Sequence, residues 1–343
     1  MSSNADSTAP SIDADPLAQA DALAMAGRPA DAVDLLTAAN RLRPDPILEM
    51  RLVELRYDAT LTDVLPPEGR PQWPPPAPDP TPDLVGRLPE ISAADLDADV
   101  VAGAVQHHGA LLVRGLLDDA GVEHCIDATL KAEAARESGA GDDRWYRPFR
   151  NFSFKQPALR RMVAEQGGTW LGDSPAATAV VLDELDRAGV VALATDYFRE
   201  RPQFSLQKST LRRYWPGRTD AGWHQDGSFL GRGVRTLNTW IALSPCGSNE
   251  PRPGLEVVPL RVPHVLEVGS WHTPNSVHPG LVAEVATSGT IVVECQPGDA
   301  LLFDELFLHR SYLTLEMTEP RFALECWLFA PSHPASDYVP LLI

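Results

Sequence analysis

Long apolar runs are missing from this sequence, and nothing in it approaches the roughly 20 apolar residues that a helix needs to cross a bilayer. The chain begins with a polar, acidic stretch instead of a basic one followed by an apolar one, so a secretory signal peptide is not expected. Cysteine is scarce, and no two cysteines form a Cys-x-x-Cys pair, which argues against a structural zinc site. We therefore expect a cytoplasmic protein with reduced, mostly buried thiols at Cys125, Cys246, Cys295 and Cys326.

Positive charge is also in short supply. Lysine occurs only at Lys131, Lys155 and Lys208, and 29 Lys and Arg stand against 47 Asp and Glu, a formal net charge of -18. Such an acidic balance argues against nucleic acid or an anionic membrane as a partner, because phosphate groups repel an acidic protein. Hydrophobic residues make up 44% of the 343 residues, which is ordinary for one large globular domain plus a small appendage.

The first 60 residues divide into a tail and a helical segment. Residues 1–15 are small and polar, without large apolar anchors, and predict a disordered tail. Over residues 16–60 the apolar positions recur with helical spacing, with a break at Gly27-Arg28-Pro29 and a third helix expected from Ile47 to Arg56. The pattern resembles one tetratricopeptide repeat at the offsets of Ala20, Gly27, Ala32, Leu36, Ala39 and Pro44. Because a lone repeat cannot bury its own apolar face, we expect these helices to dock on the main domain, on another subunit or on a partner protein.

A proline-rich segment at residues 61–90 predicts an extended, semi-rigid connector, which we expect Trp73 to anchor to a surface. The main domain is expected over residues 91–343. Its first half predicts one buried strand at 109–115. It also predicts helices at 92–105, 118–135, 174–187 and 190–199. From residue 205 the chain predicts short strands between Gly and Pro turns, at 205–214, 236–243, 254–258, 290–294, 300–303 and 322–329. Helices followed by many short strands indicate an α+β domain with an antiparallel double-sheet barrel flanked by helices.

The chemistry is concentrated in a His-x-Asp pair, His224 and Asp226. In an extended segment both side chains lie on the same side, because side chains alternate with a period of two. A further metal-competent histidine, His309, follows a glycine turn and an apolar strand. Two imidazoles and one carboxylate can occupy one face of an iron(II) ion and leave the opposite face open for a cosubstrate and oxygen. Arg321, twelve positions later, offers a fork suited to a dicarboxylate, and Ser311 places a hydroxyl close to the same spot.

A His-x-Asp pair alone occurs often by chance, and the alternative is a set of satisfied core or surface polar groups. The combination with a distal histidine and an arginine at this offset is far more specific.

From about residue 97 to 331 the sequence resembles the phytanoyl-CoA dioxygenase-like family of iron(II)/2-oxoglutarate-dependent oxygenases. The stretches that carry the resemblance are His108–Leu117, Trp223–Asp226, Asn238–Leu243, Gly254–Pro259, His309–Ser311 and Pro320–Arg321. It implies a double-stranded β-helix (jelly-roll, cupin-like) with its core at about 205–331. It also implies iron(II) on His224, Asp226 and His309, the far carboxylate of 2-oxoglutarate on Arg321 and Ser311, and Trp240 beside the cosubstrate.

The same resemblance implies that O2 is consumed, that 2-oxoglutarate is decarboxylated to succinate and CO2, and that a substrate is hydroxylated. Halogenase relatives carry a small residue in place of the carboxylate, so Asp226 favours hydroxylation. One departure from the family pattern follows Pro259, where the usual Gly-Ser-His is replaced by Leu260 to His264. That segment bears on the substrate more than on the chemistry.

Candidates for substrate contact are less sharply defined. On the strand before His224, one face carries Lys208, Thr210 and Arg212 and the other Gln207, Ser209, Leu211 and Arg213, and the sequence leaves open which faces the pocket. The segment 144–150 contains arginines together with Trp145, Tyr146 and Phe149. It could clamp an anionic or planar substrate, or it is a solvated basic loop. Solvated or structural roles are favoured over substrate contact for His264, His272 and His278.

Three functional hypotheses follow. The leading one is a hydroxylase of a small metabolite or of a carrier-bound acyl or peptidyl group. The second is a protein hydroxylase that recruits a polypeptide through the N-terminal helices, which also admits self-association there. The third is a scaffold without catalysis, against which the intact set of ligands argues.

Overall fold

The computed structural model describes residues 15–62, 73–139, 144–149, 156–217, 222–231, 233–269, 275–335 and 338–343. The tail predicted at residues 1–15 falls outside the described residues except for Asp15. Residues 63–72 of the predicted connector, residue 150 of the predicted basic segment and His272 fall outside them as well.

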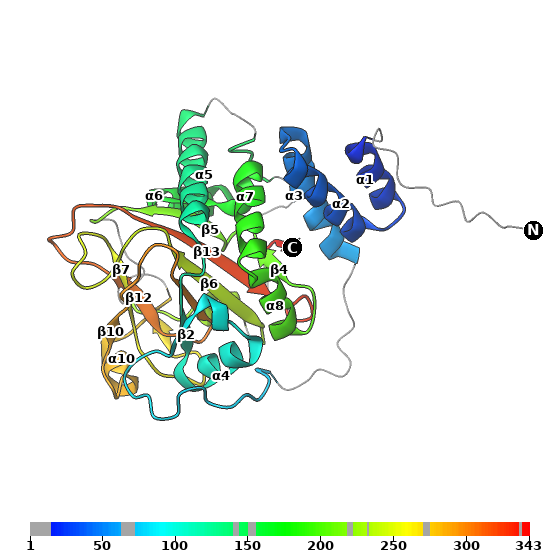
Figure 1. Cartoon of the computed structure of the whole chain (residues 1–343). Helices are drawn as coiled ribbons and strands as arrows, with labels where there is room; N and C mark the ends of the chain where they lie inside the picture. Colours follow the sequence, from blue (N-terminus) through cyan, green and yellow to red (C-terminus); the bar gives the residue numbers. More distant parts are fainter. Residues whose placement is uncertain are drawn as a thin grey trace, which may run out of the picture.

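One large sheet forms the centre of the main domain (Figure 1). From edge to edge its strands are β1 (Glu90–Ser92), β2 (Ala110–Arg114), β11 (Ala300–Phe303), β6 (Thr236–Ala242), β13 (Arg321–Phe329), β4 (Gln203–Ser205) and β14 (Pro340–Leu342). The sheet also includes β5 (Thr210–Tyr214), which pairs with β13, and β3 (Gly168–Trp170), which pairs with β5. β1 and β2 run parallel, and the other described pairs are antiparallel. Strands β6 and β13 therefore lie in the middle of the sheet.

A small sheet faces the inner side of the large one. It consists of β10 (Ile291–Val292), β7 (Gly254–Val257) and β12 (His309–Tyr312), and β8 (Val268–Gly269) and β9 (Ser276–Val277) form a separate ribbon. Buried side chains of both sheets share one hydrophobic cluster, in which Trp240 and Trp327 meet Leu255 and Val257. Two antiparallel sheets packed in this way form a double-stranded β-helix. The prediction of an α+β fold with this core is confirmed.

Helices cover the outer face of the large sheet. They are α4 (Ala98–His108), α5 (Asp119–Ser138), α7 (Pro175–Arg187) and α8 (Val190–Phe198), and shorter ones lie elsewhere at α6 (Gln156–Glu165), α9 (Gly227–Leu230) and α10 (Pro279–Val285). Along β6, Leu237 and Ile241 pack against the helices, whereas Trp240 and Ala242 face the small sheet. This alternation follows from the period of two in a strand. Among the described residues, no helix has the length and apolarity to cross a membrane.

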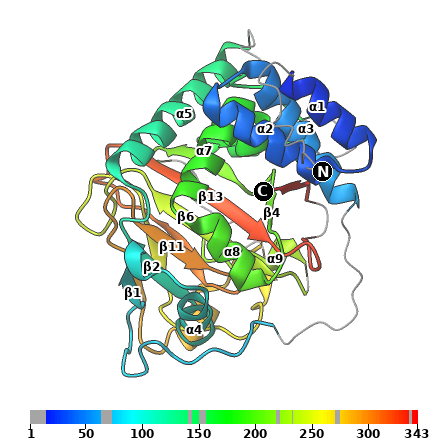
Figure 2. The same ribbon diagram turned by 45° about the vertical axis from the view of Figure 1, so that its right-hand side comes forward.

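Three N-terminal helices pack on the main domain of the same chain (Figures 1 and 2). They are α1 (Pro16–Met25), α2 (Pro29–Leu42) and α3 (Pro46–Thr62). Their own core includes Ala20 and Ala32, both fully buried, and α3 lies against α7 and β14. The predicted helices are confirmed, and docking on the main domain is the arrangement that the structure shows. The likeness to a tetratricopeptide repeat stays a prediction.

The described part of the connector lies against the main domain. Trp73 packs on Tyr197 and Phe198, with ring centroids 5.0 and 5.7 Å apart, as expected for an anchor. Farther along, a Cβ atom at Gly103 of α4 would lie only 2.2 Å from the carbonyl oxygen of Pro78. The connector therefore passes so close to α4 that only glycine fits there.

Two predicted elements differ from the structure. Ser92 caps a short 3-10 turn, η1 (Ala93–Asp95), and α4 starts instead after Asp97, whose carboxylate accepts a hydrogen bond from the Asp99 amide at 2.8 Å. The single strand predicted at 205–214 is broken into β4 and β5. Phe204 pairs with Leu328 and Thr210 with Glu325, so an advance of six positions from β4 to β5 matches an advance of only three positions along β13. The extra residues loop out as a turn, which carries Lys208.

Candidate active site

His224, Asp226 and His309 meet at one point. Their potential ligand atoms all lie within 4.8 Å of one another. A backbone bridge brings the histidines together, because the His224 amide donates to the His309 carbonyl at 3.0 Å and the His309 amide donates back at 3.1 Å. The two imidazole rings are consequently 4.3 Å apart, centroid to centroid. The structure thus brings together the three side chains that the sequence predicts as metal ligands.

Asp226 reaches this point by a different route from the one predicted. Its φ of -64° and ψ of -23° are helical, and it caps the one-turn helix α9, so the expectation of an extended His-x-Asp segment is wrong at this residue. The amide of Gly227 donates to the carbonyl of Glu305 at 2.8 Å, and a Cβ atom at Gly227 would lie 3.0 Å from that oxygen. The turn into α9, not strand alternation, therefore directs the carboxylate toward the histidines.

The orientation of both imidazole rings is set by backbone carbonyls. Nδ1 of His224 lies 2.8 Å from the carbonyl oxygen of Gly222, and Nδ1 of His309 lies 3.0 Å from that of Phe307. An Nδ1–H group that donates to a carbonyl leaves Nε2 as the free acceptor, the arrangement typical of metal-binding histidines. Burial, with a smaller contribution from His224, lowers the pKa of His309 to about 4. The His309 ring is therefore neutral near pH 7, as a metal ligand must be.

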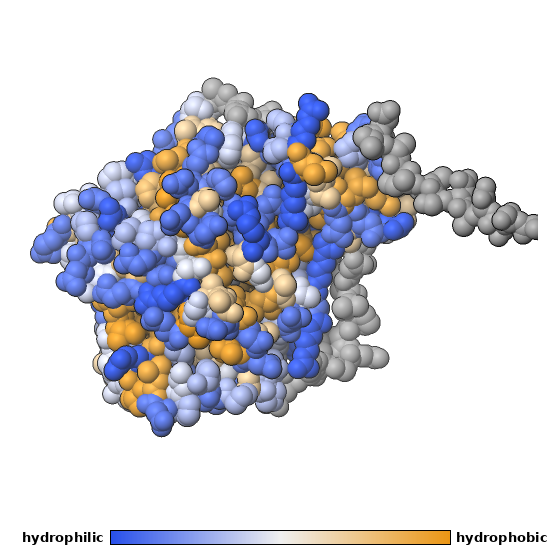
Figure 3. All heavy atoms as spheres, in the orientation of Figure 1, coloured by the Kyte–Doolittle hydropathy of each residue, from blue (hydrophilic) through white to orange (hydrophobic). Residues whose placement is uncertain are grey.

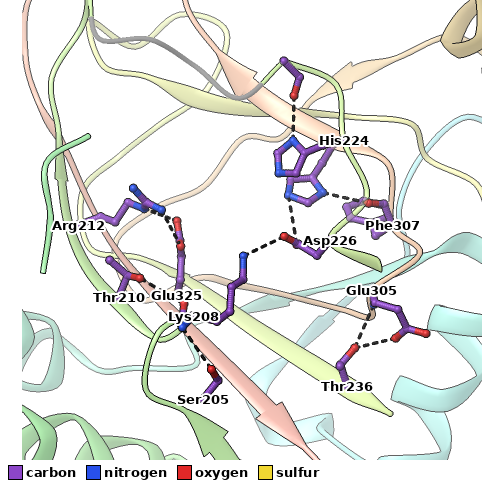
Figure 4. A network of polar contacts seen from close by, with 12 residues as sticks. Ser205, Lys208, Thr210, Arg212, His224, Asp226, Thr236, Glu305, Phe307 and Glu325 are labelled. Carbon is purple, nitrogen blue, oxygen red and sulfur yellow. Dashed lines mark hydrogen bonds and ion pairs between the residues drawn. The ribbon is translucent and has the colours of Figure 1, made fainter. Parts of the chain in front are cut away.

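The Asp226 carboxylate is buried but charged. Burial alone would raise its pKa, and the ammonium of Lys208 and the two histidines outweigh that effect, so the pKa of Asp226 lies below its ordinary value. Lys208 Nζ forms an ion pair with Asp226 Oδ1 (Figure 4) at a distance of 3.0 Å, and Asp226 Oδ2 lies 3.9 Å from His309 Nε2. One oxygen of the carboxylate thus contacts the lysine and the other faces the histidines.

The three side chains open into a cavity of about 110 Å³ between the two sheets. Strands β5, β6, β11 and β13 of the large sheet and β7 and β12 of the small sheet contribute to its wall. Arg321, Ser311 and Trp240 line it too. All six residues that the sequence analysis assigns to iron and 2-oxoglutarate therefore surround one cavity.

Arg321 has the properties of an anion-binding residue. Its side chain is almost fully buried, and its Nη1 donates to the carbonyl oxygen of Gly254 at 2.8 Å. Its Nε has no hydrogen-bond partner, and no carboxylate of the described residues forms an ion pair with it. The guanidinium lies 5.4 Å from the ring centroid of Tyr214 and 5.3 Å from that of Trp240. Burial lowers the pKa of Arg321, yet a guanidinium remains charged at neutral pH, so an anionic ligand is needed to complete its contacts.

The structure also decides which side of the segment before His224 faces the cavity. Lys208 and Arg212 line it, and Arg212 Nη2 pairs with Glu325 Oε2 at 3.1 Å (Figure 4). On the other side, Gln207 accepts a hydrogen bond from the Val339 amide at 2.7 Å, and Ser209 accepts one from the Trp327 amide at 3.2 Å. The second set therefore has structural roles.

The remaining candidates lie elsewhere. Trp145, Tyr146 and Phe149 do not line the cavity; Trp145, for example, lies 5.1 Å from the ammonium of Lys131 on α5. His278 caps α10 by accepting a hydrogen bond from the Gly280 amide at 3.1 Å. His264 contributes its carbonyl oxygen, which accepts from Gln225 Nε2 at 3.1 Å. The described part of the segment, residues 144–149, therefore does not contribute to the wall of this cavity.

Several residues of the cavity wall were not predicted: Gln166, Tyr214, Asn238, Leu255, Phe303, Glu325 and Trp327. A signal for some of them is present in the sequence. Asn238 precedes Trp240 by two positions on β6, and Glu325 and Trp327 follow Arg321 by four and six positions on β13, so strand alternation places them on the same inner face. No such signal exists for Gln166, which lies outside these strands.

Comparison with known proteins gives a family and a fold. Residues 105–313 match the model of the family described as phytanoyl-CoA dioxygenase (PhyH). A search of curated proteins found no relative of significant similarity. Among solved structures, EctD from S. alaskensis with 2-oxoglutarate and 5-hydroxyectoine has 19% identity and a TM-score of 0.50, covering 80% of this chain and 89% of that chain.

Two further solved structures are similar at lower TM-scores. AviO1 from Streptomyces viridochromogenes Tue57 has 20% identity and a TM-score of 0.44, and covers 70% of this chain and 98% of that chain. SnoK, a non-heme alpha ketoglutarate dependent carbocyclase from nogalamycin biosynthesis, has 15% identity and a TM-score of 0.48, and covers 74% of this chain and 99% of that chain.

The family match spans well over half of the chain and contains the three clustered side chains together with Trp240 and Ser311, whereas Arg321 follows it. The likeness to EctD adds evidence on the fold alone. The chain belongs to the phytanoyl-CoA dioxygenase family and is a non-haem iron(II)/2-oxoglutarate-dependent dioxygenase.

Proposed function

We propose that this dioxygenase hydroxylates a small metabolite, or a small group on a carrier, while 2-oxoglutarate is converted to succinate and CO2. One observation carries the proposal. The cluster of His224, Asp226 and His309 lines the same cavity as the buried guanidinium of Arg321, whose Nε has no hydrogen-bond partner among the described residues. Two imidazoles and a charged carboxylate suit iron(II), and a buried cation without a protein anion suits a dicarboxylate.

In this proposal, His224, Asp226 and His309 hold the iron. Arg321 binds the far carboxylate of 2-oxoglutarate, and the Ser311 hydroxyl lies in the same part of the wall. Trp240 lies over the Arg321 guanidinium, and its indole Nε1 has no hydrogen-bond partner, so it offers a donor to the cosubstrate. When bound, iron and 2-oxoglutarate supply the oxidation chemistry; the side chains of this chain orient them and keep water out.

The size and polarity of the cavity favour a small substrate. A cavity of about 110 Å³ is small, which favours a small reacting group beside the metal ligands over a folded polypeptide segment. Aromatic walls from Phe303 and Trp327 and polar groups from Asn238 and the Arg212–Glu325 pair favour a molecule with both apolar and hydrogen-bonding parts. The presence of the Asp226 carboxylate favours hydroxylation over halogenation.

A succinate-release screen tests the proposal. The iron-loaded protein is incubated with 2-oxoglutarate, O2 and candidate metabolites, and succinate and a product 16 Da heavier (one oxygen atom) are both measured, with about 1:1 stoichiometry expected from the reaction class. We expect His224→Ala to abolish both, and a His278→Ala control to retain them. Desaturation of the substrate (loss of two hydrogen atoms) or its chlorination, in place of oxygen insertion, would contradict hydroxylation.

A further inference from the structure

Lys208 is placed at the iron ligand Asp226 by an irregular part of the fold. It lies in the turn between β4 and β5, which is held by a hydrogen bond from the Ser209 amide to the Ser205 carbonyl at 2.9 Å. From this turn its side chain runs into the cavity, 19% exposed, and its ammonium lies 3.0 Å from Asp226 Oδ1 (Figure 4). A regular strand at this position would not present the lysine in the same way.

Two aromatic rings fix the path of the Lys208 side chain. Its Nζ lies 4.4 Å from the ring centroid of Phe229 and 5.2 Å from that of Trp327. Phe229 belongs to α9, the helix that Asp226 caps, and Trp327 is buried on β13. Cation–π contacts of this kind help to hold an ammonium in place. The lysine is therefore a built part of the site and not a surface side chain that happens to reach it.

The contact divides the roles of the two Asp226 oxygens. Oδ1 accepts from Lys208, whereas Oδ2 faces His309 at 3.9 Å from Nε2. A facial set of ligands takes one atom from each of its three side chains, and the remaining positions are kept for cosubstrate and oxygen. A lysine on Oδ1 leaves only Oδ2 for the metal and so protects those positions from a second aspartate oxygen.

Burial of the Asp226 carboxylate points to the same residue. The Asp226 side chain is only 4% exposed, so its charge needs a partner within the protein. Lys208 is the cation in contact with it among the described residues.

We propose that Lys208 is a positioning residue of the iron site, which holds Asp226 as a one-oxygen ligand. This inference rests on the proposed function, because it takes His224, Asp226 and His309 as the iron ligands. Groups that contact and orient metal ligands commonly contribute 10- to 100-fold to metal affinity, roughly. The role of Lys208 does not depend on which substrate the enzyme oxidises.

The test measures metal affinity rather than turnover. Mn(II), a redox-stable probe, is titrated by calorimetry into the full-length protein and into Lys208→Met and Lys208→Arg. Methionine keeps the length and the apolar contacts with Phe229 and Trp327 but removes the charge. Lys131→Met is the matched control, because Lys131 also pairs with an aspartate, Asp127, at 2.7 Å, but on an exposed part of α5.

We expect Lys208→Met to weaken Mn(II) binding by about 10- to 100-fold, Lys208→Arg to recover most of that loss, and Lys131→Met to bind like the wild type. The visible absorption of the anaerobic iron(II)–2-oxoglutarate complex should change in Lys208→Met and remain in Lys131→Met. Unchanged or tighter Mn(II) binding by a folded Lys208→Met protein would overturn the proposal. If the wild-type protein itself binds no Mn(II), the proposed function fails first, so the two failures are distinguishable.

Discussion

Buried polar atoms without a partner mark the part of the cavity that awaits a ligand. Arg321 Nε, Trp240 Nε1 and Asn238 Oδ1 have no hydrogen-bond partner within the described residues, and all three residues line the same cavity. The great majority of buried polar groups in folded proteins are paired, so such a concentration calls for an explanation. A dicarboxylate beside the iron ligands supplies the missing acceptor for Arg321.

Replacing Arg321 therefore separates cosubstrate binding from metal binding. We expect Arg321→Met to raise the KM for 2-oxoglutarate by on the order of 100-fold, because one partner of a buried charge pair is lost. Mn(II) affinity should stay within a few-fold of the wild type. Arg321→Lys should be intermediate, because it keeps the charge but not the fork. Equal losses of Mn(II) and 2-oxoglutarate affinity would show that Arg321 supports the fold of the site instead.

Glu305 gives a pH dependence that is separate from the metal ligands. Burial, assisted by the charge of Asp304, raises the pKa of Glu305 to about 7, although Thr236 donates a hydrogen bond to its carboxylate at 2.7 Å. A raised pKa means that the folded state is favoured while the carboxyl is protonated, and that this stability is lost as pH rises from the unfolded value of about 4.5 through 7.

Glu305→Gln removes this titration and keeps an acceptor for Thr236. Between pH 5 and 8.5, we expect the variant to gain about 1–3 kcal/mol of unfolding free energy relative to the wild type, since one pKa unit corresponds to about 1.4 kcal/mol. Urea denaturation at the two pH values measures the difference. A difference that is independent of pH, or that shrinks as pH rises, would contradict the assignment.

At the scale of elements, the ligands could be predicted more readily than the path of the chain. Few residue types can bind a metal or a carboxylate as His224, Asp226, His309 and Arg321 can. Their spacing is therefore informative even when the local backbone conformation is not known. The break at residues 206–209 was not predictable, because it arises from the pairing of β4 and β5 with the same strand, β13. The helical conformation of Asp226 likewise depends on the contact of Gly227 with Glu305, far along the chain.

The contact between the connector and α4 provides a test at this scale. In Gly103→Ala the added Cβ would meet the Pro78 carbonyl oxygen, a backbone atom that cannot move alone. We expect a loss of about 1–3 kcal/mol in unfolding free energy, typical of overpacking, together with faster proteolysis in the connector. Alanine normally stabilises a helix interior relative to glycine. A melting temperature at or above that of the wild type would therefore show that the connector is not packed on α4.

For the whole molecule, the N-terminal helices are joined to the main domain by buried polar contacts. Glu49 of α3, 3% exposed, accepts two hydrogen bonds from Arg144, at 2.7 and 2.8 Å, and Arg56 donates to the Leu342 carbonyl at 2.7 Å. Hydrophobic residues also reach the surface over these helices (Figure 3), where Met25 and Leu42 are 83% and 89% exposed. The division into segments 16–60, 61–90 and 91–343, and recruitment of a protein through the first, stay predictions.

Deletion of residues 1–60 would remove contacts of the main domain as well as a recruiting surface, so point variants separate the two roles. We expect Glu49→Ala to lower the unfolding free energy by about 1–3 kcal/mol, because the two hydrogen bonds between the buried Glu49 carboxylate and Arg144 are lost. The double variant Met25→Ser and Leu42→Ser should leave both stability and small-molecule turnover unchanged. If the double variant lost most of its succinate formation, the alternative of a protein substrate recruited by these helices would be favoured.

The central claim is that His224, Asp226 and His309 hold iron(II) in the cavity that Arg321 also lines. Anomalous diffraction at the iron edge, from crystals grown anaerobically with iron(II) and 2-oxoglutarate, tests it most directly. The account predicts one strong peak per chain among His224 Nε2, His309 Nε2 and the Asp226 carboxylate. A protein saturated with iron that shows no peak there, or shows its peak at other residues, would contradict it.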